Sequence, residues 1–300
     1  MAQGAFGVDL DTARAWKTRG VESGKYWLYL VRQSVSLQVG AVLLLIYVAA
    51  AGAGRLLIPY DPLKTLIGHP FSPPSSAYWF GTDRVGADVF SRTIAATGLD
   101  LRITIVAGAV ALISGTILGT MAGYFGGVLD VLSMRILEVV QAIPSLLLAM
   151  IIVQAVGPGE RNVVAVLAFV GLPYYARLVR AEILSKRNWQ FAEAARMVGN
   201  PPIRIAVRHL LPNSLGPVFA YASVNAAWVV LVTASLGFLG IGIEPGRAEW
   251  GSMISRGQPQ IITGEWWISF FPGLAVLGLT AGFYLIGDGI RDVMDPRSRA

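Results

Sequence analysis

Long apolar stretches alternate with short polar segments along most of the 300 residues of this chain. A helix of about 20 apolar residues crosses the ~30 Å hydrocarbon core of a bilayer, and the stretches are of this order in length. We therefore expect an all-α membrane protein with six transmembrane helices, at residues 35–58, 103–124, 131–156, 163–178, 217–242 and 266–290.

Composition supports a membrane protein and excludes several kinds of site. Hydrophobic residues make up 54% of the chain and charged residues only 14%, whereas soluble domains carry ~25% charged residues. The chain has no Cys, which excludes disulfides and thiolate chemistry, and its two His residues leave little for a metal site. The basic residues flank the apolar stretches instead of forming a stripe, so they predict membrane topology and no nucleic-acid binding.

The polar segments divide the chain and indicate its orientation. Most Lys and Arg residues lie before the first span, between the fourth and fifth spans and in the tail, and an excess of basic residues marks the cytoplasmic side. Both termini are therefore expected in the cytoplasm. The expected regions are a cytoplasmic N-terminal segment at 1–34, a first transmembrane helix at 35–58, an extracytoplasmic loop at 59–100, a five-helix core at 101–290 and a cytoplasmic tail at 291–300.

The first apolar stretch has a second interpretation, as a cleaved signal peptide, because small residues such as Ala49-Ala50-Ala51 lie inside it. A signal peptide has a short basic lead. Here the lead is long and contains Asp9, Asp11 and Glu22, so a retained helix is favoured.

The segment between the fourth and fifth spans predicts a short helix, a sharp turn and a second short helix. Residues 190–198 are good helix formers, and Gly199 suits the left-handed position that follows a helix. Asn200 followed by Pro201 is typical of a helix start. The second helix is expected to present Arg204 and Arg208 on one face and to end near Leu211-Pro212.

This segment resembles the EAA loop of permease subunits of binding-protein-dependent ABC importers, at Glu193-Ala194-Ala195, Gly199 and His209-Leu210-Leu211-Pro212-Asn213. Three further motifs resemble the dipeptide/oligopeptide/nickel branch of that family. They are YWFGTDRVGADVFSR at 78–92, with Ala87 where Arg is usual, EWGSM at 249–253 and GDGIRDVMDPR at 287–297.

The resemblance implies a type I ABC importer permease fold in the inner membrane of a bacterium. It further implies a heterodimer with a second permease chain, two cytoplasmic ATPase subunits that dock on the loop at 181–217, and an extracytoplasmic binding protein. The residues that it assigns to ATPase coupling are Glu193, Ala194, Ala195, Arg196, Gly199, Arg204, Arg208 and His209. Glu193→Lys or Gly199→Asp is expected to abolish transport.

No nucleotide-binding motif is visible in the chain. Gly24-Lys25 fails as a phosphate loop, because Arg19 stands where Gly is required and Tyr26 where Ser or Thr is required. We therefore expect no enzyme activity, no catalytic residue, and no cofactor or metal bound by this chain. ATP and Mg²⁺ are expected on the partner ATPases.

Polar residues within the spans are candidates for a translocation path: Glu138, Gln141, Asn225, Thr233 and Ser235. Each also has a structural interpretation. Glu138 is favoured to pair with Arg135, and hydrogen bonds between helices are the commoner role for the others.

Other patterns predict packing. Ala107, Ala111, Gly115, Gly119 and Gly123 recur every four residues, which is typical of a close helix–helix interface and less often of a pore lining. Trp266 and Trp267 suit an interfacial aromatic belt. Taken alone, the charged residues of the 78–92 motif are favoured to form a solvated turn with local ion pairs.

The function expected from the resemblance is import of di- or oligopeptides. Nickel and glutathione importers of the same branch stay open, as does a channel or scaffold that is not part of an ABC system. An intramembrane enzyme is disfavoured, because no acid, base or metal set is clustered in the spans and His209 lacks a paired nucleophile.

Overall fold

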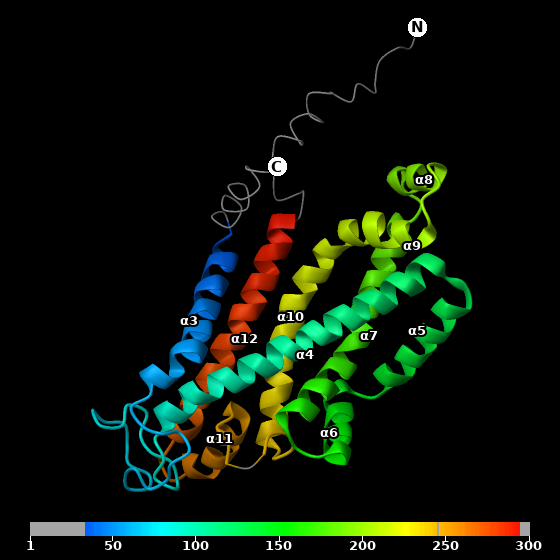
Figure 1. Cartoon of the computed structure of the whole chain (residues 1–300). Helices are drawn as coiled ribbons and strands as arrows, with labels where there is room; N and C mark the ends of the chain where they lie inside the picture. The colour runs from blue at the N-terminus through cyan, green and yellow to red at the C-terminus, as the bar shows by residue number, and fades with distance from the viewer. Residues whose placement is uncertain (1–33, 245, 295–300) are drawn as a thin grey trace.

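The computed structural model describes residues 34–244 and 246–294, and every named element in those ranges is a helix (Figure 1). In chain order they are α3 (Val35–Leu57), α4 (Val89–Phe125), α5 (Gly127–Ala142), α6 (Ser145–Val156), α7 (Glu160–Lys186), α8 (Gln190–Met197), α9 (Pro202–Arg204), the π-helix η1 (Ile205–Leu210), α10 (Leu211–Phe238), α11 (Trp250–Gly257), the 3-10 helix η2 (Gln258–Ile261) and α12 (Trp267–Met294).

The all-α bundle expected from the apolar pattern is confirmed. Among the described residues, α3, α4, α7, the stretch from α9 to α10, and α12 are each long and apolar enough to cross a membrane, and the bent pair α5–α6 makes a sixth span if it is counted as one. Residues 1–33 and 295–300, which include all but the last residue of the predicted N-terminal segment and most of the tail, lie outside the described residues. Figure 1 shows α8 near the end where α3 begins and α12 ends, and α6 and α11 at the opposite end.

Helix α4 begins at Val89, so the predicted boundary of the 59–100 loop is wrong and its last part is helical. The Asp88 carboxylate caps the helix by accepting from the Ser91 backbone N–H at 2.7 Å. The polar side chains that follow are compatible with a helix because three hydroxyls donate to the carbonyl four residues earlier, at 2.7, 3.2 and 2.8 Å, in Thr93, Thr97 and Thr104.

The third predicted span is not one helix. Helices α5 and α6 meet at 88° on either side of Ile143 and Pro144. A residue before proline is driven out of the helical region, and Ile143 is extended, with φ −93° and ψ 132°. The bend predicted at Pro144 is therefore confirmed, although it divides the stretch into two helices.

The second helix of the polar segment does not end near Leu211-Pro212 as predicted. The stretch from Pro202 to Phe238 continues through η1 into α10. Pro212 lies just after η1, where the Leu211 backbone N–H donates five residues back to the Ala206 carbonyl, and such a local π-helical turn accommodates a proline inside a continuous helix. The segment therefore joins the fifth span without a break.

The small-residue stripe of α4 lies against α7, the helix that α4 contacts most extensively. A Cβ built on Gly115 would lie 2.9 Å from the Leu172 carbonyl oxygen, and one built on Gly123 would lie 2.9 Å from the Arg180 carbonyl oxygen. These distances are shorter than van der Waals contact, so the two backbones approach closely only because side chains are absent. The predicted helix interface is confirmed.

The segment between α3 and α4 folds back on the bundle and buries several of its charges. Asp83 accepts from the backbone N–H groups of Val85 and Ala87, each at 2.9 Å. Arg92 is only 4% exposed, lies 4.0 Å from Asp83 and donates to the Pro62 carbonyl at 3.2 Å. The predicted local ion pair is present, but the prediction of a solvated turn is wrong.

Only one of the two predicted belt tryptophans faces outward. Trp266 is exposed, whereas Trp267 is buried and its indole N–H donates to the Thr82 carbonyl at 3.2 Å. The belt prediction is therefore wrong for Trp267, which ties the start of α12 to the segment after α3.

Candidate functional site

The predicted turn between the two short helices is present. Helix α8 ends at Met197, Val198 caps it, and Gly199 follows with φ +82°, the left-handed conformation expected there. Asn200 was expected to cap the second helix, and this is wrong because Pro201 takes that place. The Asn200 side chain instead donates to the Ala195 carbonyl at 3.1 Å, which closes the end of α8.

One face of α8 is anchored to the bundle. Ala192 and Ala195 are buried in a cluster with Ile205 and Leu210 of η1 and with buried residues of α7 and α10. A methyl side chain lets α8 lie close to η1. Ala195, one of the residues assigned to coupling, thus contacts the chain's own core.

The opposite face of α8 is exposed and mixed in character. Glu193 and Ala194 are exposed, and no residue in the described part of the chain pairs with the Glu193 carboxylate. Met197 is 89% exposed and Val198 is 82% exposed beside it. Exposed apolar side chains that are bordered by polar residues mark a protein–protein contact.

The basic residues of the segment have different environments. Arg196 donates to the Arg187 carbonyl at 2.6 Å and so ties α8 to the end of α7. Arg204 and Arg208 are both exposed, whereas His209 is half-buried. Two of the cations, Arg204 and Arg208, therefore lie on the surface and close to Glu193 in the sequence, whereas the His209 imidazole is partly buried.

Replacing Gly199 by Val is expected to weaken the ordering of α8 by about 1–3 kcal/mol, because a β-branched residue resists a positive φ. No atom lies within 4 Å of a Cβ added at Gly199, so the expected destabilisation comes from the backbone conformation and not from a steric clash. Gly199→Asn is the matched control, since Asn tolerates this conformation better. Limited proteolysis within 187–201 measures the difference, and equal cleavage of the two variants would contradict the prediction.

The five candidates for a translocation path lie on two helices, two of them on α5 and three on α10. Glu138 pairs with Arg135 at 2.8 Å on an exposed face of α5, which confirms the structural interpretation of that residue. Gln141, one turn further along α5, has a buried side-chain oxygen with no hydrogen-bond partner among the described residues.

The three candidates on α10 lie in different surroundings. Asn225 is buried and accepts from the Tyr175 hydroxyl of α7 at 3.1 Å, which is the helix-to-helix hydrogen bond expected of such residues. Ser235 donates to the Leu231 carbonyl of its own helix at 2.7 Å. The Thr233 hydroxyl is buried without a partner among the described residues.

A buried carboxylate at the other end of the bundle was missed by the reasoning from sequence. Glu249 is fully buried and caps α11 by accepting from the backbone N–H groups of Gly251 and Ser252, at 2.6 and 2.7 Å. Burial raises the pKa of this carboxyl above its ordinary value. The backbone N–H of Trp250 donates to Asp100 at 3.2 Å, so α11 is fixed to α4. The EWGSM motif was the available signal, although nothing in it indicated burial.

Comparison with known proteins identifies the class. Residues 115–300, more than half of the chain, match the family model described as "Binding-protein-dependent transport system inner membrane component". The chain belongs to this family. It is a multi-pass inner-membrane permease subunit of a transport system that depends on a binding protein.

Individual relatives cover almost the whole chain. The "Probable D,D-dipeptide transport system permease protein DdpC" of Escherichia coli (strain K12) is 35% identical over 92% of each chain. The "Dipeptide transport system permease protein DppC" of Alkalihalophilus pseudofirmus is 37% identical over 87% of this chain and 86% of its own length. The "Glutathione transport system permease protein GsiD" of Pectobacterium atrosepticum is 35% identical over 92% of this chain and 91% of its own length. The predicted branch of ABC importer permeases is confirmed.

Proposed function

We propose that this chain is a permease subunit of an ABC importer for short peptides. The printed names of several relatives, which specify dipeptides, D,D-dipeptides or di- and tripeptides, support the substrate class. Within the described residues no group of three or more His, Cys, Asp or Glu side chains is placed to hold a metal ion, so nothing there favours nickel.

The exposed face of α8 is the single observation that carries the coupling role. It presents Glu193 beside Met197 and Val198 at one end of the bundle, while Ala192 and Ala195 hold the helix to η1. We infer that an ATPase subunit docks on this face and that a basic residue of the ATPase pairs with Glu193. Arg204 and Arg208 add exposed positive charge for the same contact.

The mechanism follows from how α8 is attached. ATP binding closes the two ATPase subunits, which carry ATP and Mg²⁺, and α8 moves with them. Because α8 packs on η1, and η1 continues into α10, this movement reaches a membrane-spanning helix. Two paired permease chains would open outward to receive peptide from the binding protein. Docking shifts the bundle only if α8 is bound more tightly in one state than in the other.

Orientation completes the proposal. Figure 1 shows α8 near the end of the bundle where α3 begins and α12 ends. If α8 docks on a cytoplasmic ATPase, both termini are cytoplasmic, and the segment between α3 and α4 faces the binding protein. The basic residues of the 177–217 region point to the same orientation.

Uptake in cells that lack this chain tests the proposal. We expect the restored chain to recover uptake of labelled dialanine and trialanine, and the Glu193→Lys variant not to recover it. A chain that restores glutathione uptake alone would instead assign the function printed for the Pectobacterium relative. Restored nickel uptake alone would assign the metal branch, and peptide uptake that is independent of the chain would contradict the proposal.

A further inference from the structure

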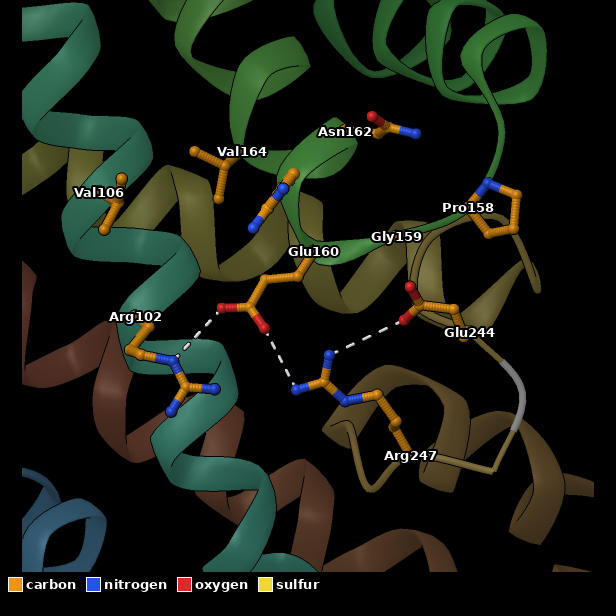
Figure 2. Close-up of a pocket in the computed structure, with 10 residues that line it drawn as sticks. Arg102, Val106, Pro158, Gly159, Glu160, Asn162, Val164, Glu244 and Arg247 are labelled. Carbon is orange, nitrogen blue, oxygen red and sulfur yellow. Dashed lines mark hydrogen bonds and ion pairs between the residues drawn. The ribbon is translucent and has the colours of Figure 1, made fainter.

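An open cavity of about 600 Å³ lies where α4, the start of α7 and the segment between α10 and α11 meet (Figure 2). Five of the residues that line it are charged: Arg102, Glu160, Arg161, Glu244 and Arg247. Because α7 begins in this cavity and ends next to α8, the cavity lies at the end of the bundle opposite the proposed ATPase contact. Ligand sites in proteins commonly have volumes of about 300–1,000 Å³.

A chain of ion pairs crosses the cavity. One Glu160 oxygen lies 3.3 Å from the Arg102 Nε, and the other lies 3.1 Å from a terminal nitrogen of Arg247. The second terminal nitrogen of Arg247 lies 3.8 Å from Glu244. Figure 2 shows these side chains pointing toward one another from three different segments.

These ion pairs leave binding capacity unused. A guanidinium carries five N–H donors in a fixed fork, and Arg102 uses only its Nε here. The Arg102 side chain is 58% exposed, and no residue in the described part of the chain pairs with Arg161. Three cations face two carboxylates, so the cavity has one positive charge in excess next to free acceptors on Glu244.

We propose that this cavity binds the charged ends of a short zwitterionic peptide on its way through the permease. The terminal nitrogens of Arg102, together with Arg161, take the peptide α-carboxylate, and Glu244 takes the α-ammonium group. A guanidinium fork matches a carboxylate in geometry, which makes Arg the suitable partner. The inference rests on the proposed import of peptides and adds the residues that contact the substrate.

The composition of the cavity favours recognition of the peptide ends over its side chains. Beside the charged residues, the lining consists mainly of small or aliphatic groups, among them Val106, Pro158 and Val164. Ion pairs that are open to solvent stabilise a fold little, so Glu160 can share Arg102 with a peptide carboxylate at small cost. The site therefore selects a free carboxylate and accepts varied side chains.

Because the chain has no Cys, one introduced Cys can report whether the cavity is occupied. Val164→Cys places a thiol in the lining, and Ser76→Cys places one on an exposed segment outside it. The purified transporter, assembled with its partner subunits, is labelled with a charged maleimide at increasing concentrations of dialanine or of dialanine amide. We expect dialanine to slow labelling at 164 and not at 76, and the amide to require at least about tenfold higher concentration.

A second variant tests the role assigned to Arg102. In the Val164→Cys background, Arg102→Gln is expected to raise the dialanine concentration needed for protection at least about tenfold and to leave the amide response unchanged. Arg135→Gln removes another exposed Arg from an ion pair on α5, and it is expected to change neither response. A merely structural role for Arg102 would shift both peptides equally, and that result would overturn the proposal.

Two further outcomes separate this inference from the proposed function. Equal protection by dialanine and its amide in the Val164→Cys protein with Arg102 intact overturns the inference, so the test holds even if Arg102→Gln fails to assemble. Dialanine uptake by cells without protection of the thiol at 164 overturns the cavity assignment and leaves peptide import standing. If the chain restores no peptide uptake, the proposed import of peptides is contradicted, whatever the labelling at 164 shows.

Discussion

Glu193→Lys is expected to lower peptide uptake by more than about tenfold while the chain stays in the membrane at its normal level. The Glu193 carboxylate is exposed and has no ion-pair partner among the described residues, so its replacement breaks no ion pair of the folded chain. At the proposed ATPase contact the same replacement puts a cation against a cation. Like charges brought together in an interface cost several kcal/mol, which is more than tenfold in affinity.

Co-purification of the ATPase with a tagged chain measures this effect directly, alongside uptake. Asp61→Lys is the control for ATPase recovery, because Asp61 is also exposed and lies in the segment after α3, away from α8, where its carboxylate accepts, among the described residues, only from the backbone N–H of Leu63 at 2.9 Å. Glu193→Gln removes the charge without reversing it and is expected to have an intermediate effect. Normal uptake and normal ATPase recovery with Glu193→Lys would show that α8 is not the docking element.

The apolar pattern predicted the number and order of the spans better than their ends. A hydrophobic stretch shows where a helix meets lipid, but a helix continues as long as its polar groups find partners. Helix α4 starts at Val89 because Asp88 caps it and its hydroxyls bond to its own backbone. Such partners form locally, yet residues like Ser91 and Arg92 are equally common in loops.

In the segment between the fourth and fifth spans, the sequence predicted the structure well where only one residue type can adopt the required backbone conformation. Gly199 could be placed at the end of α8 because a left-handed residue is almost always Gly at that position. Pro212 was ambiguous, because proline both ends helices and begins them. Only the packing of η1 and α10 on the rest of the bundle decides between the two, and packing is not visible in local sequence.

The ion pairs of the cavity were beyond prediction for a different reason. Arg102, Glu160 and Arg247 come from three segments that meet only in the folded chain. In the sequence each appears as an isolated charge near the end of a span, a position where charges are common. The candidates inside the spans were more visible and less informative, since Asn225 and Ser235 form ordinary helix hydrogen bonds.

The contact between α4 and α7 carries the largest expected effect on stability. Gly119→Leu is expected to destabilise the protein by about 3 kcal/mol or more, because overpacking a close interface forces the helices apart. A Cβ at Gly119 would lie 2.9 Å from the Val179 Cβ and would also overlap the Ala176 carbonyl. Neither group is the flexible end of a side chain, so the strain cannot be relieved by a rotamer change.

Gly108→Leu makes the same chemical change on the same helix with the opposite expected sign. No atom of the described chain lies within 4 Å of a Cβ at Gly108, and replacing Gly in a helix gains up to ~1 kcal/mol. Thermal unfolding of the two variants in detergent, with the partner subunits present, compares them. Equal losses would mean that α4 is sensitive to added bulk on any face, whereas a loss at 119 alone shows that close approach of α7 is what the glycine permits.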